Sequence, residues 1–248
     1  MSDTVLIFGA TSAMAVHTAR KFAAQNARIG LAGRDRTRLE ALAQDLTVRG
    51  AEQTAVFPDF DAGNEASLGQ TVVAAWQEFD TVDHVLIAYG TLPDQSETET
   101  DAAALRHALE INFSSVALLA HAVADRMIQQ GHGTISVISS VAGLRGRQSN
   151  YVYGAAKGGL NFFLQGLRNR LYPKGIRVLT LLPGFVDTPM TRDIPKGPLF
   201  VSAEKAGGVI HRAMTRRKAD IVYVPGFWRA IMTIIRSIPE PLFKRLKL

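Results

Sequence analysis

The chain has 248 residues, of which 47% are hydrophobic, a length and composition typical of one α/β domain with a sizeable core. It contains no cysteine, which excludes disulfides, thiolate nucleophiles and cysteine-based zinc sites, and its six histidines form no metal-ligating pattern, so we expect no metal. The formal net charge of +6 permits contact with phosphates, but scattered solvated lysines explain it as well, and we expect no nucleic-acid partner.

The N-terminal residues run directly into an apolar stretch, without the basic region or the cleavage-site pattern of a signal peptide. No apolar run in the sequence approaches the ~20 residues that a membrane-spanning helix needs. We therefore expect a cytoplasmic protein.

A strand, a turn of small residues and a helix open the chain. Residues 4–8 form a short apolar run, which predicts a buried parallel strand, and a helical pattern extends to about residue 24. Free backbone N–H groups and the helix dipole between them would face an anion, as in a dinucleotide site, although an ordinary strand–helix turn fits equally well. The candidate cofactor contacts in this turn are Gly9, Thr11, Ser12, Ala13 and Met14.

The end of the second predicted strand, residues 27–33, bears on the choice between NAD and NADP. Sites that prefer NAD usually place an acidic residue there for the ribose 2′-hydroxyl, whereas this chain has Gly33 followed by Arg34. A guanidinium suits a 2′-phosphate, so we predict a preference for NADPH, with Arg34 as the main contact and Arg38 as a helper. Alternatively, both arginines are solvated charges at the start of a helix that Asp35 caps.

The middle of the chain continues to alternate between helical and extended patterns. The pattern predicts helices at 36–49 and 68–79 and strands at 54–57 and 82–88. Residues 92–99 are polar and turn-like, and one long helical pattern then covers residues 102–130 and ends at Gly131.

Tyr153 and Lys157 are four residues apart in a predicted helix, residues 151–172, so both side chains lie on one face. An ammonium beside a phenol lowers the pKa of the phenol, which is ~10 when unperturbed. Such a pair therefore provides a general acid and base near neutral pH. Tyr151, six residues before the lysine, points to a different face.

The remaining strands complete an open parallel sheet. They are predicted at 133–139, 176–182 and 220–224, and the first delivers Ser140 to the sheet edge at which ligands bind. Residues 189–200 carry three prolines and no period, which is typical of a mobile substrate lid. Strands that alternate with helices in this way predict an α/β fold, a single-domain doubly wound parallel sheet with helices on both faces.

Residues 226–248 are predicted to extend this domain, which we place at residues 1–225. Their apolar side chains alternate with arginines and lysines, and Pro239 and Pro241 divide the segment into two short helical pieces. The pattern is typical of a helix that lies at a membrane surface. A helix that covers the substrate cleft or a partner subunit would have the same pattern.

The spacing S-x(12)-Y-x(3)-K, formed by Ser140, Tyr153 and Lys157, resembles that of the classical short-chain dehydrogenase/reductase (SDR) family. The resemblance covers nearly the whole chain. It implies a Rossmann fold, an NAD(P)-dependent oxidoreductase that reduces a carbonyl to an alcohol by hydride transfer, and a homodimer or homotetramer. In this family, the helix that carries the tyrosine packs at a subunit interface. One face of the helix here would therefore lie either at that interface or in the monomer core, and its residues are Leu160, Phe163, Leu164 and Leu167.

The resemblance also assigns roles to individual residues. The implied catalytic residues are Ser140, Tyr153, Lys157 and Asn112. Asn112 would kink its helix and hold a water that relays protons to the lysine, although a capped helix break has the same sequence pattern. Asp59 would accept from the adenine amino group, or serve only as a turn residue. The implied cofactor contacts beyond the first turn and Arg34 are Asp59, Gly90, Tyr153, Lys157, Pro183, Gly184, Val186 and Thr188.

Two motifs depart from the family. Ala13 and Ala15 replace the second and third glycines of T-G-x-x-x-G-x-G, which weakens the prediction of a pyrophosphate site. The sequence I-A-Y-G replaces N-N-A-G, so only Gly90 matches its last residue. With the C-terminal segment and the stretch R-G-R-Q-S-N-Y-V-Y-G-A-A-K, the substituted turn resembles a subgroup of the family similar to the decaprenylphosphoryl-2-keto-pentofuranose reductase.

This subgroup resemblance implies a keto-sugar on a lipid phosphate as the substrate. Such a substrate would explain why residues 226–248 are basic and apolar, since the protein would contact the inner face of a membrane through them. Its phosphate would also give an anionic partner to Arg145 and Arg147, which are otherwise surface charges. The alternatives are a soluble ketone, an aldehyde or a 3-oxoacyl thioester. A non-catalytic dinucleotide-sensing protein is a further alternative, although such proteins typically lose the tyrosine or the lysine.

Overall fold

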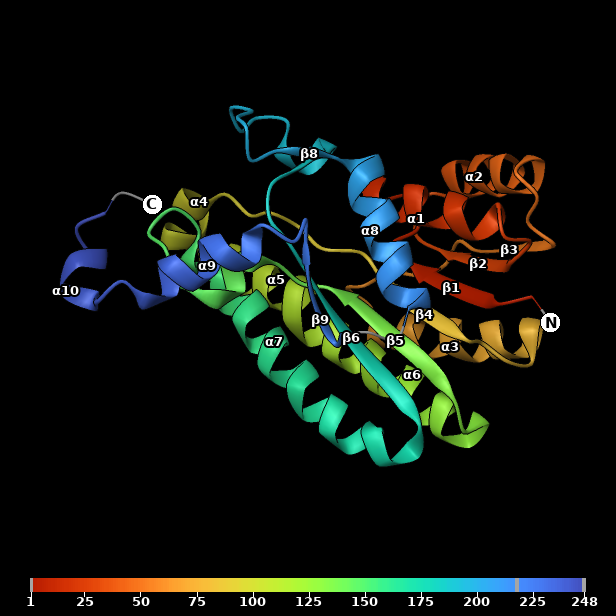
Figure 1. Cartoon of the computed structure of the whole chain (residues 1–248). Coiled ribbons are helices and arrows are strands. Elements are labelled where there is room, and N and C mark those ends of the chain that lie inside the picture. The colour runs from red at the N-terminus through yellow and green to blue at the C-terminus, as the bar shows by residue number, and fades with distance from the viewer. Residues whose placement is uncertain (1, 217–218, 247–248) are drawn as a thin grey trace.

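Seven parallel strands form the centre of the protein in the computed structural model, which describes residues 2–216 and 219–246 (Figure 1). Their order is β3-β2-β1-β4-β5-β6-β9, so the chain winds outwards from β1 in one direction and from β4 in the other. This order confirms the predicted doubly wound α/β fold. The strands are β1 (Thr4–Phe8), β2 (Arg28–Ala32), β3 (Gln53–Phe57), β4 (His84–Ile87), β5 (Gly133–Ile138), β6 (Ile176–Pro183) and β9 (Ile221–Val224).

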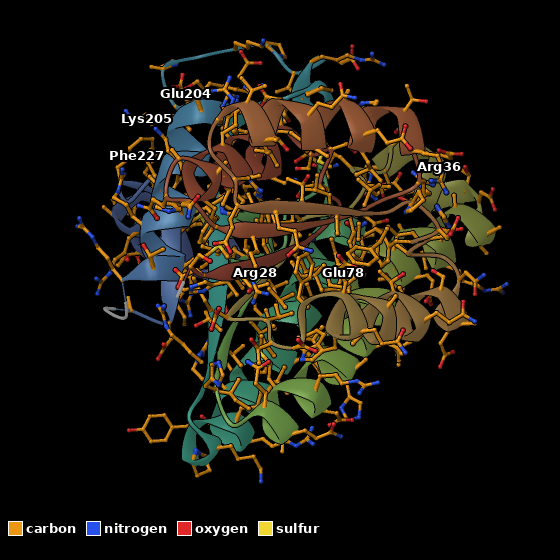
Figure 2. All side chains as sticks on the ribbon, turned by 90° about the vertical axis from the view of Figure 1, so that its right-hand side faces the viewer. Arg28, Arg36, Glu78, Glu204, Lys205 and Phe227 are labelled. Atoms are coloured by element: carbon orange, nitrogen blue, oxygen red, sulfur yellow. The ribbon has the colours of Figure 1, made fainter. Side chains whose placement is uncertain are left out.

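Helices cover both faces of the sheet, and Figure 2 shows the layers from the edge formed by β3. One face packs against α1 (Ala13–Ala23), α2 (Arg36–Val48) and α8 (Ala203–Thr215). The other packs against α3 (Glu65–Phe79), α6 (Ser115–Gln130) and α7 (Tyr151–Leu171). The shorter elements are α4 (Gln95–Thr100), α5 (Ala102–Leu109), α9 (Trp228–Ser237), α10 (Glu240–Phe243) and a small sheet of β7 (Val186–Asp187) and β8 (Val201–Ser202).

The apolar runs of the sequence explain the central strands. All residues of β1 and β5 are buried, as expected for strands that helices cover on both faces. Because side chains alternate along a strand, Leu6 and Phe8 pack towards α3, α6 and α7, whereas Val5 and Ile7 pack towards α1, α2 and α8. The sheet is therefore a fixed support, and its carboxyl edge positions the residues that follow each strand.

Two segments differ from the prediction. Residues 92–99 contain the start of α4, because the Asp94 side chain caps this helix by accepting from the backbone N–H of Ser96 at 2.8 Å. The long helix predicted at 102–130 is divided by one π-helical turn, Glu110–Ser114, which separates α5 from α6. Such wide turns often lie at functional sites.

The face of α7 that the family resemblance allowed at a subunit interface lies in the core of this chain. Leu160, Leu164 and Leu167 are buried in the layer between the sheet and its helices, and Phe163 packs partly against them. Phe162 is instead the most exposed aromatic residue of this helix, with 78% of its surface accessible. An interface on α7 would therefore use the Phe162 face, and the oligomeric state stays a prediction.

The C-terminal segment forms two short helices, α9 and α10, with Pro239 between them, as the prolines predicted. Within residues 2–216 and 219–246, no helix combines the length and the apolar character needed to cross a bilayer.

Candidate active site

A cleft of about 630 Å³ lies at the carboxyl edge of the sheet, where residues that directly follow β1, β2, β4, β5 and β6 line its wall. Open α/β sheets bind their ligands in this position. All the site residues predicted from the sequence line the cleft except Asp59. They are Gly9, Thr11, Ser12, Ala13, Met14, Arg34, Gly90, Asn112, Ser140, Tyr153, Lys157, Pro183, Gly184, Val186 and Thr188.

The first turn has the backbone geometry of a phosphate site, although alanines replace two of the family's glycines. Gly9 has a φ of +73°, and a Cβ there would lie 2.8 Å from the backbone nitrogen of Tyr89, so this position requires glycine. Ala15 is fully buried among the residues between α1 and the sheet. Ser12 makes no side-chain hydrogen bond to the first turn of α1, which leaves the N–H groups of that turn available to an anion. The turn therefore fits the pyrophosphate of a dinucleotide.

Arg34 and Arg38 line the cleft beside this turn. Arg38 Nη2 donates to the backbone oxygen of Thr11 at 3.4 Å, which connects α2 to the phosphate turn. Asp35 caps α2, because its Oδ1 accepts from the backbone N–H of Arg38 at 3.0 Å. The two interpretations of these residues are therefore compatible, since the helix begins here and its arginines also reach the cleft.

The structure does not support the prediction for Asp59, which is exposed and lies outside the cleft wall. Asp61 lines the cleft instead, and its Oδ1 accepts from the backbone N–H of Gly63 at 3.0 Å. Phe60 lies between the two carboxylates and is buried, with its ring centroid 5.1 Å from that of Phe8. Phe60 adjoins both carboxylates in the sequence, so no local pattern distinguishes Asp61 from Asp59.

Asn112 lies in the π-helical turn and is fully buried. Its Oδ1 accepts from the backbone N–H of Thr91 at 3.1 Å, and its Nδ2 donates to Thr91 Oγ1 at 3.1 Å and to the Ala108 oxygen at 3.0 Å. These bonds compensate the cost of burying the amide, and the kink predicted for Asn112 takes the form of the π-turn. Gly90 is required beside it, because a Cβ there would lie 2.8 Å from Asn112 Oδ1.

Ser140, Tyr153 and Lys157 come together between the end of β5 and the first turns of α7. The side chains of Tyr153 and Ser140 are hydrogen-bonded. Lys157 Nζ donates to the backbone oxygen of Ile138 at 3.3 Å and lies 5.8 Å from the centroid of the Tyr153 ring. Tyr151 is 45% exposed and is not part of the cleft wall, which agrees with the helical phase that favoured Tyr153.

Burial moves the pKa values of the tyrosine and the lysine in opposite directions. Desolvation raises the pKa of Tyr153 to about 12, and the hydrogen bond with Ser140 opposes this change. Desolvation lowers the pKa of Lys157 to about 8. We expected the lysine to lower the pKa of the tyrosine, but desolvation of the phenol has the larger effect in this structure. At neutral pH Tyr153 therefore keeps its proton and Lys157 keeps its charge.

The family model described as short chain dehydrogenase matches residues 3–198. The chain belongs to this family. It is accordingly an NAD(P)-dependent oxidoreductase, which confirms the predicted class of enzyme.

Relatives of this short-chain dehydrogenase match along the whole chain. It is 36% identical to an uncharacterized oxidoreductase of Streptomyces coelicolor over 248 residues, which cover 98% of this chain and 95% of the relative. It is 37% identical to an uncharacterized oxidoreductase of Mycobacterium tuberculosis over 255 residues, which cover 99% of each. The solved structure of levodione reductase is similar, with a TM-score of 0.82 and 26% identity over 93% of this chain and 98% of that one.

One wall of the cleft in this short-chain dehydrogenase carries a residue that the sequence did not single out. Trp228, the first residue of α9, is only 3% exposed and lines the cleft. A Cβ on Gly184 would lie 1.9 Å from Trp228 Cε2, so the indole occupies the space beside this glycine. The Phe185 ring meets the indole edge-on, with 5.4 Å between the centroids. No local sequence pattern reveals this wall, because it depends on a contact between distant segments.

Arg145 fastens the C-terminal segment of this short-chain dehydrogenase to the loop that follows Ser140. Its Nη2 lies 2.6 Å from Glu240 Oε2 and donates to the backbone oxygen of Ile238 at 3.3 Å. Its guanidinium carbon lies 4.2 Å from the centroid of the Phe243 ring. Of the alternatives for residues 226–248, the structure therefore supports a cover for the cleft, whereas contact with a membrane stays a prediction.

Proposed function

We propose that the chain is an NADPH-dependent reductase that converts a substrate carbonyl to an alcohol. The observation that carries the proposal is that one cleft holds Ser140, Tyr153 and Lys157 together with Arg34 and Arg38. The serine follows β5 and Arg34 follows β2, with β1 and β4 between them, which is roughly 15 Å at ~4.8 Å per strand. An extended dinucleotide spans such a distance. When bound, its nicotinamide supplies the hydride that the carbonyl carbon receives.

The side chains of the cleft perform the proton chemistry. Tyr153 donates its proton to the oxygen of the substrate as negative charge develops there, and the Ser140 hydroxyl hydrogen-bonds the same oxygen. Because the pKa of Tyr153 is about 12, its hydroxyl is protonated at neutral pH and can act as the acid. Lys157 remains charged below its pKa of about 8 and stabilises the phenolate that the transfer leaves behind. Asn112 holds the adjoining backbone in place and supports the relay that returns a proton to the tyrosine.

The preference for NADPH rests on the two arginines at the other end of the cleft. Arg34 and Arg38 are exposed side chains that line the cleft. Gly33 occupies the position at the end of β2 where an NAD site usually carries a carboxylate. Guanidinium groups bind a phosphate through charge-assisted, bidentate hydrogen bonds, whereas the 2′-hydroxyl of NAD offers them no charge.

For the substrate, we propose a keto-sugar carried on a lipid phosphate. Its support is the subgroup resemblance, the aromatic wall of Phe185 and Trp228, and the outer side of α9, where Phe227 and Ile234 are exposed. Arg229 and Arg236 lie on the polar side of the same helix, so α9 has the composition of a helix that lies on an anionic membrane. A soluble ketone, an aldehyde or a 3-oxoacyl thioester is the alternative substrate.

The test of the cofactor proposal is a fluorescence titration with NADPH and NADH. The wild type should bind NADPH at least tenfold more tightly than NADH, and Arg34→Ala should lose most of that preference while still binding NADH. Tyr153→Phe should bind NADPH as the wild type does and show no turnover with any carbonyl that the wild type reduces. Absence of binding by both cofactors would refute the enzyme proposal.

The membrane contact has a separate test. Vesicles that contain phosphatidylglycerol should retain the wild type in a flotation assay, and vesicles of phosphatidylcholine alone should retain less of it. Ile234→Asp, which places a carboxylate on the exposed side of α9, should reduce retention. The matched control is Val48→Asp, which introduces the same carboxylate at an apolar residue that is also exposed, at the end of α2. Equal retention of both variants would contradict the membrane contact.

A further inference from the structure

Three buried polar atoms in the cleft have no hydrogen-bond partner among the described residues. They are Arg147 Nε, Asn150 Oδ1 and Trp228 Nε1. All three residues line the cleft. Because an unpaired buried polar group costs free energy, proteins rarely leave one without a role, and three in one cleft point to a ligand that supplies the missing partners.

The three residues surround the part of the cleft where the substrate reacts. Arg147 and Asn150 lie in the loop that joins Ser140 to Tyr153. Trp228 packs in a small cluster with Val141, the residue that follows the serine. These residues come from other elements than the phosphate turn at the start of α1, so we assign their polar atoms to the substrate rather than to the phosphates of a dinucleotide.

Arg147 differs from the nearby Arg145 in that its guanidinium has no counter-charge among the described residues. Arg145 is paired with Glu240 and covers the Phe243 ring. The Arg147 side chain forms no ion pair and no hydrogen bond within the described part of the chain, and burial lowers its pKa from the ordinary value. A guanidinium stays charged in proteins, so this partly buried cation lacks a counter-charge that an anion would supply.

We propose that Arg147, Asn150 and Trp228 form a subsite that holds a phosphate and an adjoining hydroxyl of the substrate. This inference rests on the proposed function, because the subsite is part of the same cleft. Arg147 donates to the phosphate oxygens, Asn150 Oδ1 accepts from the hydroxyl, and the indole N–H of Trp228 donates to a second oxygen. The substrate class is therefore a hydroxylated carbonyl compound with a phosphate group, whether that phosphate belongs to a lipid or to a soluble sugar.

Calorimetric binding to the full chain tests the subsite without requiring turnover. The probes are dodecyl phosphate below its critical micelle concentration, ribose 5-phosphate, and their uncharged counterparts dodecanol and ribose. At least one phosphate probe should bind the wild type tenfold or more tightly than its counterpart. Arg147→Ala should bring that ratio close to one, and Arg147→Lys should retain part of it. A preference for dodecyl phosphate indicates a lipid phosphate, and a preference for ribose 5-phosphate indicates a soluble sugar.

Two control variants separate this subsite from other cationic regions. Arg34→Ala should keep the preference for phosphate probes, because its guanidinium lies at the cofactor's 2′-phosphate end, and Arg229→Ala should keep it because that side chain is exposed on α9. The proposal is overturned if the wild type binds charged and uncharged probes equally, or if Arg147→Ala keeps the preference. In either case, intact NADPH binding by the wild type and by Arg147→Ala would leave the proposed reductase function standing.

Discussion

Removing the Arg145 side chain should release the C-terminal segment locally while the rest of the fold remains intact. The ion pair contributes little, ~0.5 kcal/mol, because the Glu240 side chain is 72% exposed and solvent screens it. The contact with the Phe243 ring adds ~1 kcal/mol, and the hydrogen bond to the Ile238 oxygen adds ~0.5 kcal/mol. The sum, about 2 kcal/mol, corresponds to a roughly 30-fold increase in the equilibrium constant for opening α10 in Arg145→Ala.

Amide hydrogen exchange of α10 measures this opening. The backbone N–H groups of Phe243 and Lys244 donate to the oxygens of Pro239 at 2.9 Å and Glu240 at 3.1 Å, so they exchange only when the helix opens. Their exchange should be about tenfold to thirtyfold faster in Arg145→Ala. Arg229→Ala removes the same charge from an exposed position and should leave both amides unchanged. Exchange within twofold of the wild type in Arg145→Ala would refute the proposed role of this contact.

Three further predictions concern the interior of the cleft. Because the pKa of Lys157 is lowered to about 8, its ammonium is present below that pH and lost above it. The value of kcat/KM for carbonyl reduction should therefore fall by up to tenfold per pH unit above about pH 8. A profile that stays flat to pH 10 would contradict this prediction. Gly90→Ala should lower kcat by roughly 10–100-fold, because the new Cβ would lie 2.8 Å from Asn112 Oδ1 and displace the amide. Gly184→Ala should destabilise the protein by ~1–3 kcal/mol in urea unfolding and red-shift tryptophan emission, because the new Cβ would force Trp228 out of the wall.

Two glycines elsewhere provide matched controls for the last two substitutions. A Cβ at Gly69, in α3, or at Gly226, just before α9, would meet no atom within 4 Å. Gly69→Ala and Gly226→Ala should therefore leave kcat and the emission maximum unchanged. If they reproduced the losses, the effects would come from the backbone and not from the contacts named above.

The sequence was sufficient for the fold and for the relative placement of the predicted catalytic residues because both depend on local patterns. The strand predicted at 4–8 has the bounds of β1, since a buried parallel strand is a continuous apolar run with turn residues on both sides. The relative placement of Tyr153 and Lys157 follows from the geometry of one helical turn. Both signals lie within a few residues and need no knowledge of the rest of the chain.

The features that sequence reasoning missed depend on contacts between distant segments. Asp59 and Asp61 both follow β3 in a turn without periodicity, and only the burial of Phe60 against Phe8 determines which carboxylate reaches the cleft. The asparagine indicated a kink at residue 112, but the apolar pattern around it did not predict a π-helical turn or its bounds, Glu110–Ser114. Trp228 belongs to the wall only because Gly184 leaves room for its ring.

The position of Trp228 also divides the polypeptide into parts that can vary independently. Every predicted catalytic side chain lies within residues 3–198, which the family model matches, whereas the indole comes from a later stretch. Substitutions in α9 can therefore reshape the space offered to the substrate without replacing the proton donor. Exchanging α9 and α10 between homologous enzymes, with both Arg145 and Glu240 retained so that their ion pair still holds the segment, offers a direct route to new substrate selectivity on an unchanged catalytic core.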